Sequence, residues 1–180
     1  MIFNALKRLF SNSKEPSLEN LPDSFVVFDL ETTGLDSSKH AIIEIGAIRF
    51  QKGRQLQDSF SALVKTKKRL SAKITEITGI DKALLDEKGL DPTDVFPNFV
   101  AFIGDLPIIS YNFDFDGPFL VAAFNEFAGA QKLTNPSACA LKMARRAWPG
   151  LKSYRLGDLS RLGALDISDE HRALGIRSAL

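Results

Sequence analysis

Two carboxylates stand two residues apart in the stretch FDLETTGL, at Asp29 and Glu31. The segment FVVFDLE (25–31) begins with four apolar residues, which predicts a buried strand. Side chains two residues apart on a strand leave the same face of the sheet. Neighbouring carboxylates repel each other and are costly to bury, whereas a divalent cation such as Mg²⁺ or Mn²⁺ would stabilise both. The pair also fits the alternative of a solvent-exposed strand end.

A tight turn is predicted directly after these acids, at TTG (32–34). Glycine lets another group come close to the backbone. We therefore expect that a substrate phosphate could approach the backbone at this turn.

A second acidic stretch, YNFDFDGPFL (111–120), follows a short predicted buried strand, LPIIS (106–110). Asp116 directly precedes the helix that we expect to begin at Pro118. It could be another metal ligand or simply the N-cap of that helix. Asp114 is a competing acid that the spacing does not exclude, and Asn112 could satisfy backbone groups in the same turn.

His171 opens the last stretch of the chain, HRALGIRSAL (171–180). A lone histidine at a helix start is commonly a surface or capping residue. Beside a metal cluster, a neutral imidazole could instead take a proton from water near pH 7.

The remaining pattern predicts an α/β domain in which helices cover a mixed sheet. The polar, proline-containing segment 11–24 reads as a linker, so we expect an N-terminal arm and linker (1–24) and one domain (25–180). Two further strands and six helices are expected, the strands at 41–50 and 56–64 and the helices at 71–78, 92–105, 118–129, 137–148, 155–165 and 171–180.

The composition is that of an ordinary globular protein, with 180 residues, 44% of them hydrophobic and 25% charged. The single cysteine, Cys139, excludes an internal disulfide, and no apolar run is long enough for a membrane span. The start of the chain lacks the order of a signal peptide, so we expect a cytoplasmic protein. Although the net charge is only +1, basic residues gather at 65–69 and between 142 and 161.

Together these stretches resemble the DEDDh branch of the DnaQ-like 3′–5′ exonucleases, the family of the proofreading subunits of bacterial DNA polymerase III. FDLETTGL followed by IIEIGAI (42–48) resembles the first motif of that family. YNFDFDGPFL resembles the second motif, N-x-x-F-D-x-x-F-L, and this match selects Asp116 over Asp114, although Tyr111 stands where many members have histidine. LKMARRAWPGLKSYRLGDL (141–159) resembles the segment before the third motif, and HRAL (171–174) resembles its start.

The resemblance implies an RNase H-like fold, a mixed sheet that starts with an antiparallel meander and carries helices on both faces. It implies two divalent cations, Mg²⁺ or Mn²⁺, held by Asp29, Glu31 and Asp116, with His171 as the general base. The implied reaction releases nucleoside 5′-monophosphates from single-stranded 3′ ends, with DNA favoured over RNA and a DNA polymerase subunit as a possible partner. Substrate contacts are implied at Thr32, Thr33, Gly34, Leu35 and Asn112, and the basic residues between 142 and 161 could track phosphates.

One position departs from the family pattern. The third motif places an aspartate five residues after the histidine, where this chain has Ile176, and an aspartate inserted after Gly175 would restore the match. The chain also ends four residues after Ile176, so we expect the last helix to be short. Two explanations fit both departures: a degenerate natural protein, or a truncated or altered sequence. Activity is therefore expected to be attenuated, and the alternative is a catalytically inactive module that binds nucleic acid or a polymerase partner.

Overall fold

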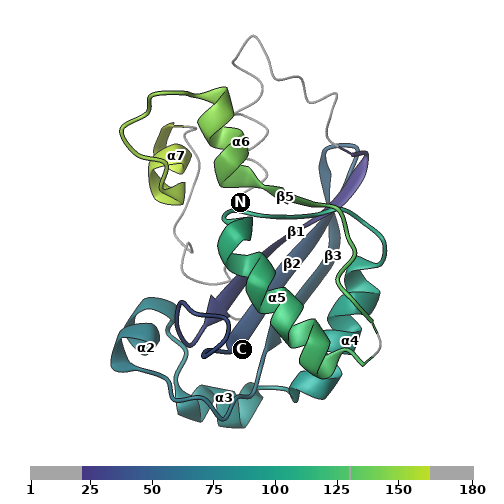
Figure 1. The fold of residues 1–180 in the computed structure, drawn as a ribbon, viewed down its shortest axis with the longest axis vertical. Coiled ribbons are helices and arrows are strands. Elements are labelled where there is room, and N and C mark those ends of the chain that lie inside the picture. The colour runs from purple at the N-terminus through teal and green to yellow at the C-terminus, as the bar shows by residue number, and fades with distance from the viewer. Residues whose placement is uncertain (1–21, 130, 163–180) are drawn as a thin grey trace.

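A five-stranded sheet forms the centre of the computed structural model, which describes residues 22–129 and 131–162 (Figure 1). The order across the sheet is β3-β2-β1-β4-β5. β1, β2 and β3 are antiparallel neighbours, whereas β4 is parallel to β1 and β5 is parallel to β4. The predicted mixed sheet with an initial meander is therefore confirmed. The strands are β1 (Ser24–Thr32), β2 (Ile42–Gln51), β3 (Arg54–Leu63), β4 (Ile108–Ser110) and β5 (Ser137–Cys139).

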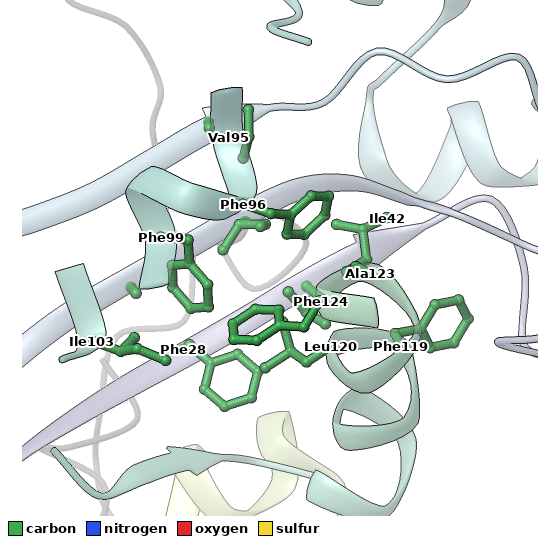
Figure 2. Close-up of a cluster of buried hydrophobic side chains, with 14 of the residues drawn as sticks. Phe28, Ile42, Val95, Phe96, Phe99, Ile103, Phe119, Leu120, Ala123 and Phe124 are labelled. Atoms are coloured by element: carbon green, nitrogen blue, oxygen red, sulfur yellow. The ribbon is translucent and has the colours of Figure 1, made fainter. Parts of the chain in front are cut away.

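One face of the sheet is covered by α4 (Pro92–Ile103) and α5 (Phe113–Phe127). Alternate residues of β1, namely Val26, Phe28 and Leu30, point to this face because side chains alternate along a strand. Figure 2 shows how aromatic rings from both helices meet Phe28 there. The rings of Phe28 and Phe99 lie edge to face, with centroids 6.4 Å apart, as aromatic pairs prefer.

The opposite face is covered by α6 (Ala140–Ala147) at one end of the strands. Phe25 and Val27 of β1 pack there with Phe50 and Ala140. Ile43 of β2 packs with Leu85 of α3 (Lys82–Lys88) in a separate cluster. Helices thus cover both faces, as expected for an RNase H-like fold. The two remaining helices are α2 (Ala72–Thr78) and α7 (Leu156–Leu162).

Three details of the predicted elements are wrong. The helix expected to begin at Pro118 is α5, which begins five residues earlier at Phe113. The helix expected over 137–148 begins only at Ala140, because residues 137–139 pair with β4 as a fifth strand. The short helix α3 was not expected at all. In the second case, sheet pairing, a tertiary contact, outweighs local helix preference.

Most of the predicted N-terminal arm lies outside the described residues, and so does the whole of the third motif. Residues 1–21 belong to the predicted arm, and 163–180 include His171 and Ile176. In the portion of the chain that is described, no helix has both the length and the apolarity to cross a bilayer.

Candidate active site

Asp29 and Glu31 lie in one row on β1 with Phe25 and Val27. The two apolar residues pack beneath α6, and the two carboxylates follow at the end of the strand where that cover stops. The strand therefore carries its acids on the face that we predicted they would share. Glu44 joins them, because it is the direct partner of Glu31 in the register between β1 and β2.

Asp116 reaches the same edge of the sheet from α5, which begins three residues after the end of β4. β4 runs parallel to β1, so the carboxyl ends of the two strands lie at one edge. Asp116 lies in the early part of α5 and is only 3% exposed, while the N-cap position is occupied by Asn112. The alternative in which Asp116 caps the helix is therefore wrong.

The electrostatics show that these carboxylates act on one another. Burial raises the pKa of Asp29 well above its usual range, and the charges of Asp116 and Glu31 raise it further. Glu44 adds a smaller effect in the same direction. Burial raises the pKa of Asp116 to about 6. Repulsion among buried carboxylates is the condition that a bound cation would relieve.

Ser110 supplies an additional polar atom at this edge. Its hydroxyl oxygen is fully buried and has no hydrogen-bond partner among the described residues. The hydroxyl lies close enough to Asp116 to lower the pKa of that carboxyl, although the two groups do not meet in hydrogen-bond geometry. An unsatisfied buried hydroxyl beside a buried carboxylate marks a place where a further polar partner would be stabilising.

The described carboxylates fit a divalent cation by their chemistry, but they do not form a complete binding site. Asp29, Glu31 and Asp116 offer the hard oxygen atoms that Mg²⁺ and Mn²⁺ prefer. Within residues 22–129 and 131–162, however, no three Asp, Glu, His or Cys side chains come together as a group that could hold a metal ion. His171 and Ile176, where the resemblance places a base and a missing ligand, lie beyond these residues.

The turn after β1 is held against the segment that leads into β2. The amide of Thr33 donates to the carbonyl of Ala41 at 2.9 Å, and the Thr33 hydroxyl accepts from the Ala41 amide at 3.1 Å. The same hydroxyl lies 3.1 Å from Nδ1 of His40. A Cβ on Gly34 would come within 2.4 Å of the His40 ring, so any larger residue there would displace the ring. His40 thereby shapes the turn, a role that the sequence did not indicate.

The predicted substrate-contacting residues differ in what they expose. Thr32 and Thr33 are buried, and the Thr32 hydroxyl donates to the carbonyl of Gly34 at 2.7 Å. Leu35 is 84% exposed although it is a large apolar residue. Asn112 is exposed and makes no side-chain capping bond to α5. The groups left free to meet a ligand are thus Leu35 and the Asn112 amide.

Tyr111, at the position of the family histidine, joins β4 to the segment before α7. Its hydroxyl donates to the carbonyl of Tyr154, and its own carbonyl accepts from the amide of Leu141 at 2.8 Å. Burial raises the pKa of Tyr111 to about 12, so it remains a neutral hydrogen-bond donor at physiological pH. Tyrosine at this position has a clear structural role.

Comparison with known proteins identifies the family. The sequence model of the exonuclease family called RNase_T matches residues 26–175. The chain belongs to the exonuclease family. This membership confirms the expected class of enzyme, and the match includes all three carboxylates of the candidate site.

Relatives of this exonuclease chain include replication proteins. It is 36% identical over 159 residues to the DNA polymerase III subunit epsilon of Aquifex aeolicus, covering 87% of this chain and 76% of that subunit. It is 35% identical over 152 residues to the PolC-type DNA polymerase III of Bacillus subtilis, covering 84% of this chain but only 10% of that polymerase. The chain thus spans about a tenth of the length of the PolC-type relative.

The fold of this exonuclease chain is also found in solved structures. E. coli exonuclease I in complex with a dA16 oligonucleotide superimposes with a TM-score of 0.74 at 19% sequence identity. The superposition covers 86% of this chain and 38% of exonuclease I. This similarity confirms the RNase H-like arrangement of sheet and helices.

Proposed function

We propose that the chain is a 3′–5′ exonuclease that removes nucleoside 5′-monophosphates from single-stranded 3′ ends, with DNA favoured, and that its activity depends on divalent cations. The observation that carries the proposal is that Asp29, Glu31 and Asp116 meet at one edge of the sheet, so closely that the charges of Asp116 and Glu31 act on Asp29. Family membership and the relative named as an epsilon subunit support the same activity. The oligonucleotide complex of exonuclease I supports a DNA strand as the ligand.

In this proposal each side chain of the site has a distinct task. Asp29, Glu31 and Asp116 hold the cations, which when bound stabilise the charge that develops on the phosphate oxygens. His171 takes the proton of the attacking water. Attack breaks the bond between phosphorus and the 3′ oxygen of the preceding nucleotide, which leaves a 3′ hydroxyl on the shortened strand. Leu35 and Asn112 contact the terminal nucleotide.

Basic side chains near the site provide contacts for the strand. The ammonium group of Lys142 forms an ion pair with Asp114 at 2.6 Å, two residues before Asp116. The guanidinium of Arg145 lies 5.7 Å from the centroid of the Tyr154 ring. Arg146 and Arg155 are exposed. We assign Arg145, Arg146 and Arg155 to phosphate contacts, whose contribution to binding falls as salt concentration rises.

We further propose that turnover is attenuated because Ile176 stands where the resemblance expects an aspartate. The family match ends at Gly175 and does not extend to this residue. With one carboxylate fewer, cation binding weakens more than strand binding does. An epsilon-like chain would act together with a DNA polymerase subunit, and we propose such a partner on the strength of the relative from Aquifex aeolicus.

The test is a 3′-end degradation assay on 5′-labelled DNA and RNA strands of matched sequence, with Mg²⁺, with Mn²⁺ and with a chelator. We expect stepwise shortening and release of 5′-mononucleotides with either cation and none with the chelator, with DNA degraded faster than RNA. A variant with an aspartate inserted after Gly175 should gain about tenfold or more in rate, as expected when a metal site is completed. Asp29→Ala should remove the activity, and Asp114→Asn serves as the matched acidic control.

The outcomes separate the enzyme from a binding module. The chain is an inactive binding module if it binds the strand without shortening it, if Asp29→Ala leaves that binding unaltered, and if the inserted aspartate brings no gain in cleavage rate. If the parent protein is as active as the insertion variant, only the proposal of attenuated turnover fails. The exonuclease assignment then still holds.

A further inference from the structure

A pocket of about 710 Å³ opens on the α4–α5 face of the sheet, the face opposite to that of Asp29 and Glu31. This volume lies in the range of pockets that bind small ligands. Its floor is apolar and includes Phe96, Phe119 and Phe127. The position and the size raise the question of which ligand it would hold.

The rim of the pocket is rich in lysine. Lys65, Lys67 and Lys68 come from the segment after β3, and they form no ion pair with another described residue. All three residues are exposed. They belong to the KTKKR cluster (65–69), which the proposed function leaves without a role. This rim therefore attracts anions.

Among the other charged groups of the rim, Asp91 interacts with this segment: hydrogen bonds from Thr93 lower the pKa of its carboxyl, and the charge of Lys65 lowers it further. Lys82 forms an ion pair with Asp86. Asp91 accepts hydrogen bonds from the amide and the hydroxyl of Thr93, at 2.9 and 2.6 Å. Glu126 belongs to α5 on the opposite wall. Lys67 and Lys68 remain available for an external partner.

The backbone that carries these lysines is fixed in place. The Lys65 amide donates to the carbonyl of Leu90 at 2.9 Å, and the Leu90 amide donates to the carbonyl of Leu63 at 2.8 Å. The Lys68 amide donates to the Thr66 hydroxyl at 3.1 Å. A fixed backbone lowers the entropic cost of binding, because only side chains must be ordered.

His40 connects the lining of the pocket to the turn that follows the β1 carboxylates. The imidazole lines the pocket, and its ring also packs against Gly34 in the turn that precedes exposed Leu35. Ser37 and Ser38, which follow that turn, line the pocket as well. A strand whose 3′ end lies at Leu35 can pass over this edge toward the lysines.

We infer that this pocket binds an upstream nucleotide of the substrate strand, with its phosphate against Lys67 and Lys68 and its base over the apolar floor. The inference rests on the proposed exonuclease function and adds a second contact to it. Single-strand binding sites combine a cationic surface for the backbone with apolar or aromatic surface for the bases, and this pocket offers both. The contact would make the enzyme prefer strands long enough to reach it.

The test compares Lys67→Glu and Lys68→Glu with the charge-matched control Arg54→Glu. Arg54 is exposed at the hairpin between β2 and β3, at the opposite end of β1 from Asp29 and Glu31. Two substrates are used, a labelled single-stranded oligonucleotide and a nitrophenyl ester of thymidine 5′-monophosphate, which is too short to reach the pocket. For each lysine variant we expect kcat/KM on the strand, divided by kcat/KM on the ester, to fall about fivefold. The slope of the logarithm of the strand-binding constant against the logarithm of salt concentration should also become shallower by about one, the loss of one phosphate contact.

The two proposals fail in distinguishable ways. Equal ratios and equal salt slopes in the lysine variants and in Arg54→Glu would overturn the pocket assignment. If no version hydrolyses the ester or the strand, the exonuclease proposal fails. Fluorescence anisotropy of the labelled strand, measured with a chelator present, then still tests the pocket, because Lys68→Glu should raise the Kd about fivefold and Arg54→Glu should not.

Discussion

Gly34 packs directly against the imidazole of His40, so closely that a methyl group on Gly34 would come within 2.4 Å of the ring atom Cε1. Displacing the ring would also disturb its contact with Thr33, whose hydroxyl lies 3.1 Å from Nδ1. This contact fixes the shape of the turn that separates the carboxylates of β1 from exposed Leu35. The packing of the turn is therefore open to a direct test.

Gly34→Ala should destabilise the protein by about 1–2 kcal/mol, because the added methyl group forces the His40 ring out of its place. Urea unfolding measures the free energy of unfolding. In a His40→Ala background the same substitution should cost much less, since the obstructing ring is gone. Equal costs in the two backgrounds would show that the contact does not control the turn.

The pKa of Asp116 makes stability depend on pH in an unusual direction. Burial raises this pKa to about 6 from the ordinary value of 3.8. Between about pH 4 and pH 6 the folded state keeps a proton that the unfolded state has released, so the free energy of unfolding falls as pH rises. With a chelator present, we expect Asp116 to account for a loss of about 3 kcal/mol by pH 7.

The measurement is urea unfolding at a series of pH values. Asp116→Asn should flatten the pH dependence by about this amount, because the amide does not titrate. Its neighbour Asp114 is exposed and serves as the control, so Asp114→Asn should keep the slope of the parent protein. A slope that is the same for Asp116→Asn and the parent would contradict the assignment.

A bound cation should reverse the effect of carboxylate repulsion on stability. Adding Mn²⁺ or Mg²⁺ should raise the midpoint of thermal unfolding, since a ligand that binds only the folded state at a hundred times its Kd adds about 2.7 kcal/mol. Asp29→Asn should strongly reduce this gain in stability, because it removes a proposed cation ligand. It should also raise the stability of the cation-free protein, because it removes a carboxylate that is buried and repelled by Asp116 and Glu31. A cation-dependent shift that survives in Asp29→Asn would place the cation elsewhere.

The sequence predicts the sheet and the shared face of Asp29 and Glu31 well, for physical reasons. The strands carry long runs of residues that favour extended structure, and Asp29 and Glu31 share a face because alternation along a strand is fixed by geometry. The choice of Asp116 over Asp114 came from the motif and stays a prediction; in the structure Asp116 is buried and Asp114 is exposed.

The contacts that complete the site depend on tertiary structure that the sequence does not display. Glu44 was part of a quoted motif, but its position opposite Glu31 follows from the register between β1 and β2. His40 contacts Thr33 and Gly34 only because the chain turns back after β1. The start of α5 at Phe113 was missed because Pro118 suggested a first turn, whereas the helix tolerates proline inside it.

Leu35 provides the most selective test of substrate contact, because its side chain is 84% exposed and contributes little to the folded core. Leu35→Ala should leave the free energy of unfolding within about 0.5 kcal/mol of the parent value. It should raise KM for a single strand several-fold, since the apolar side chain would no longer pack against the terminal nucleotide. Leu56→Ala, on β3 near the far hairpin, removes the same group from a partly exposed site and serves as the control. A rise in KM common to both variants, or absent from both, would show that Leu35 does not meet the substrate.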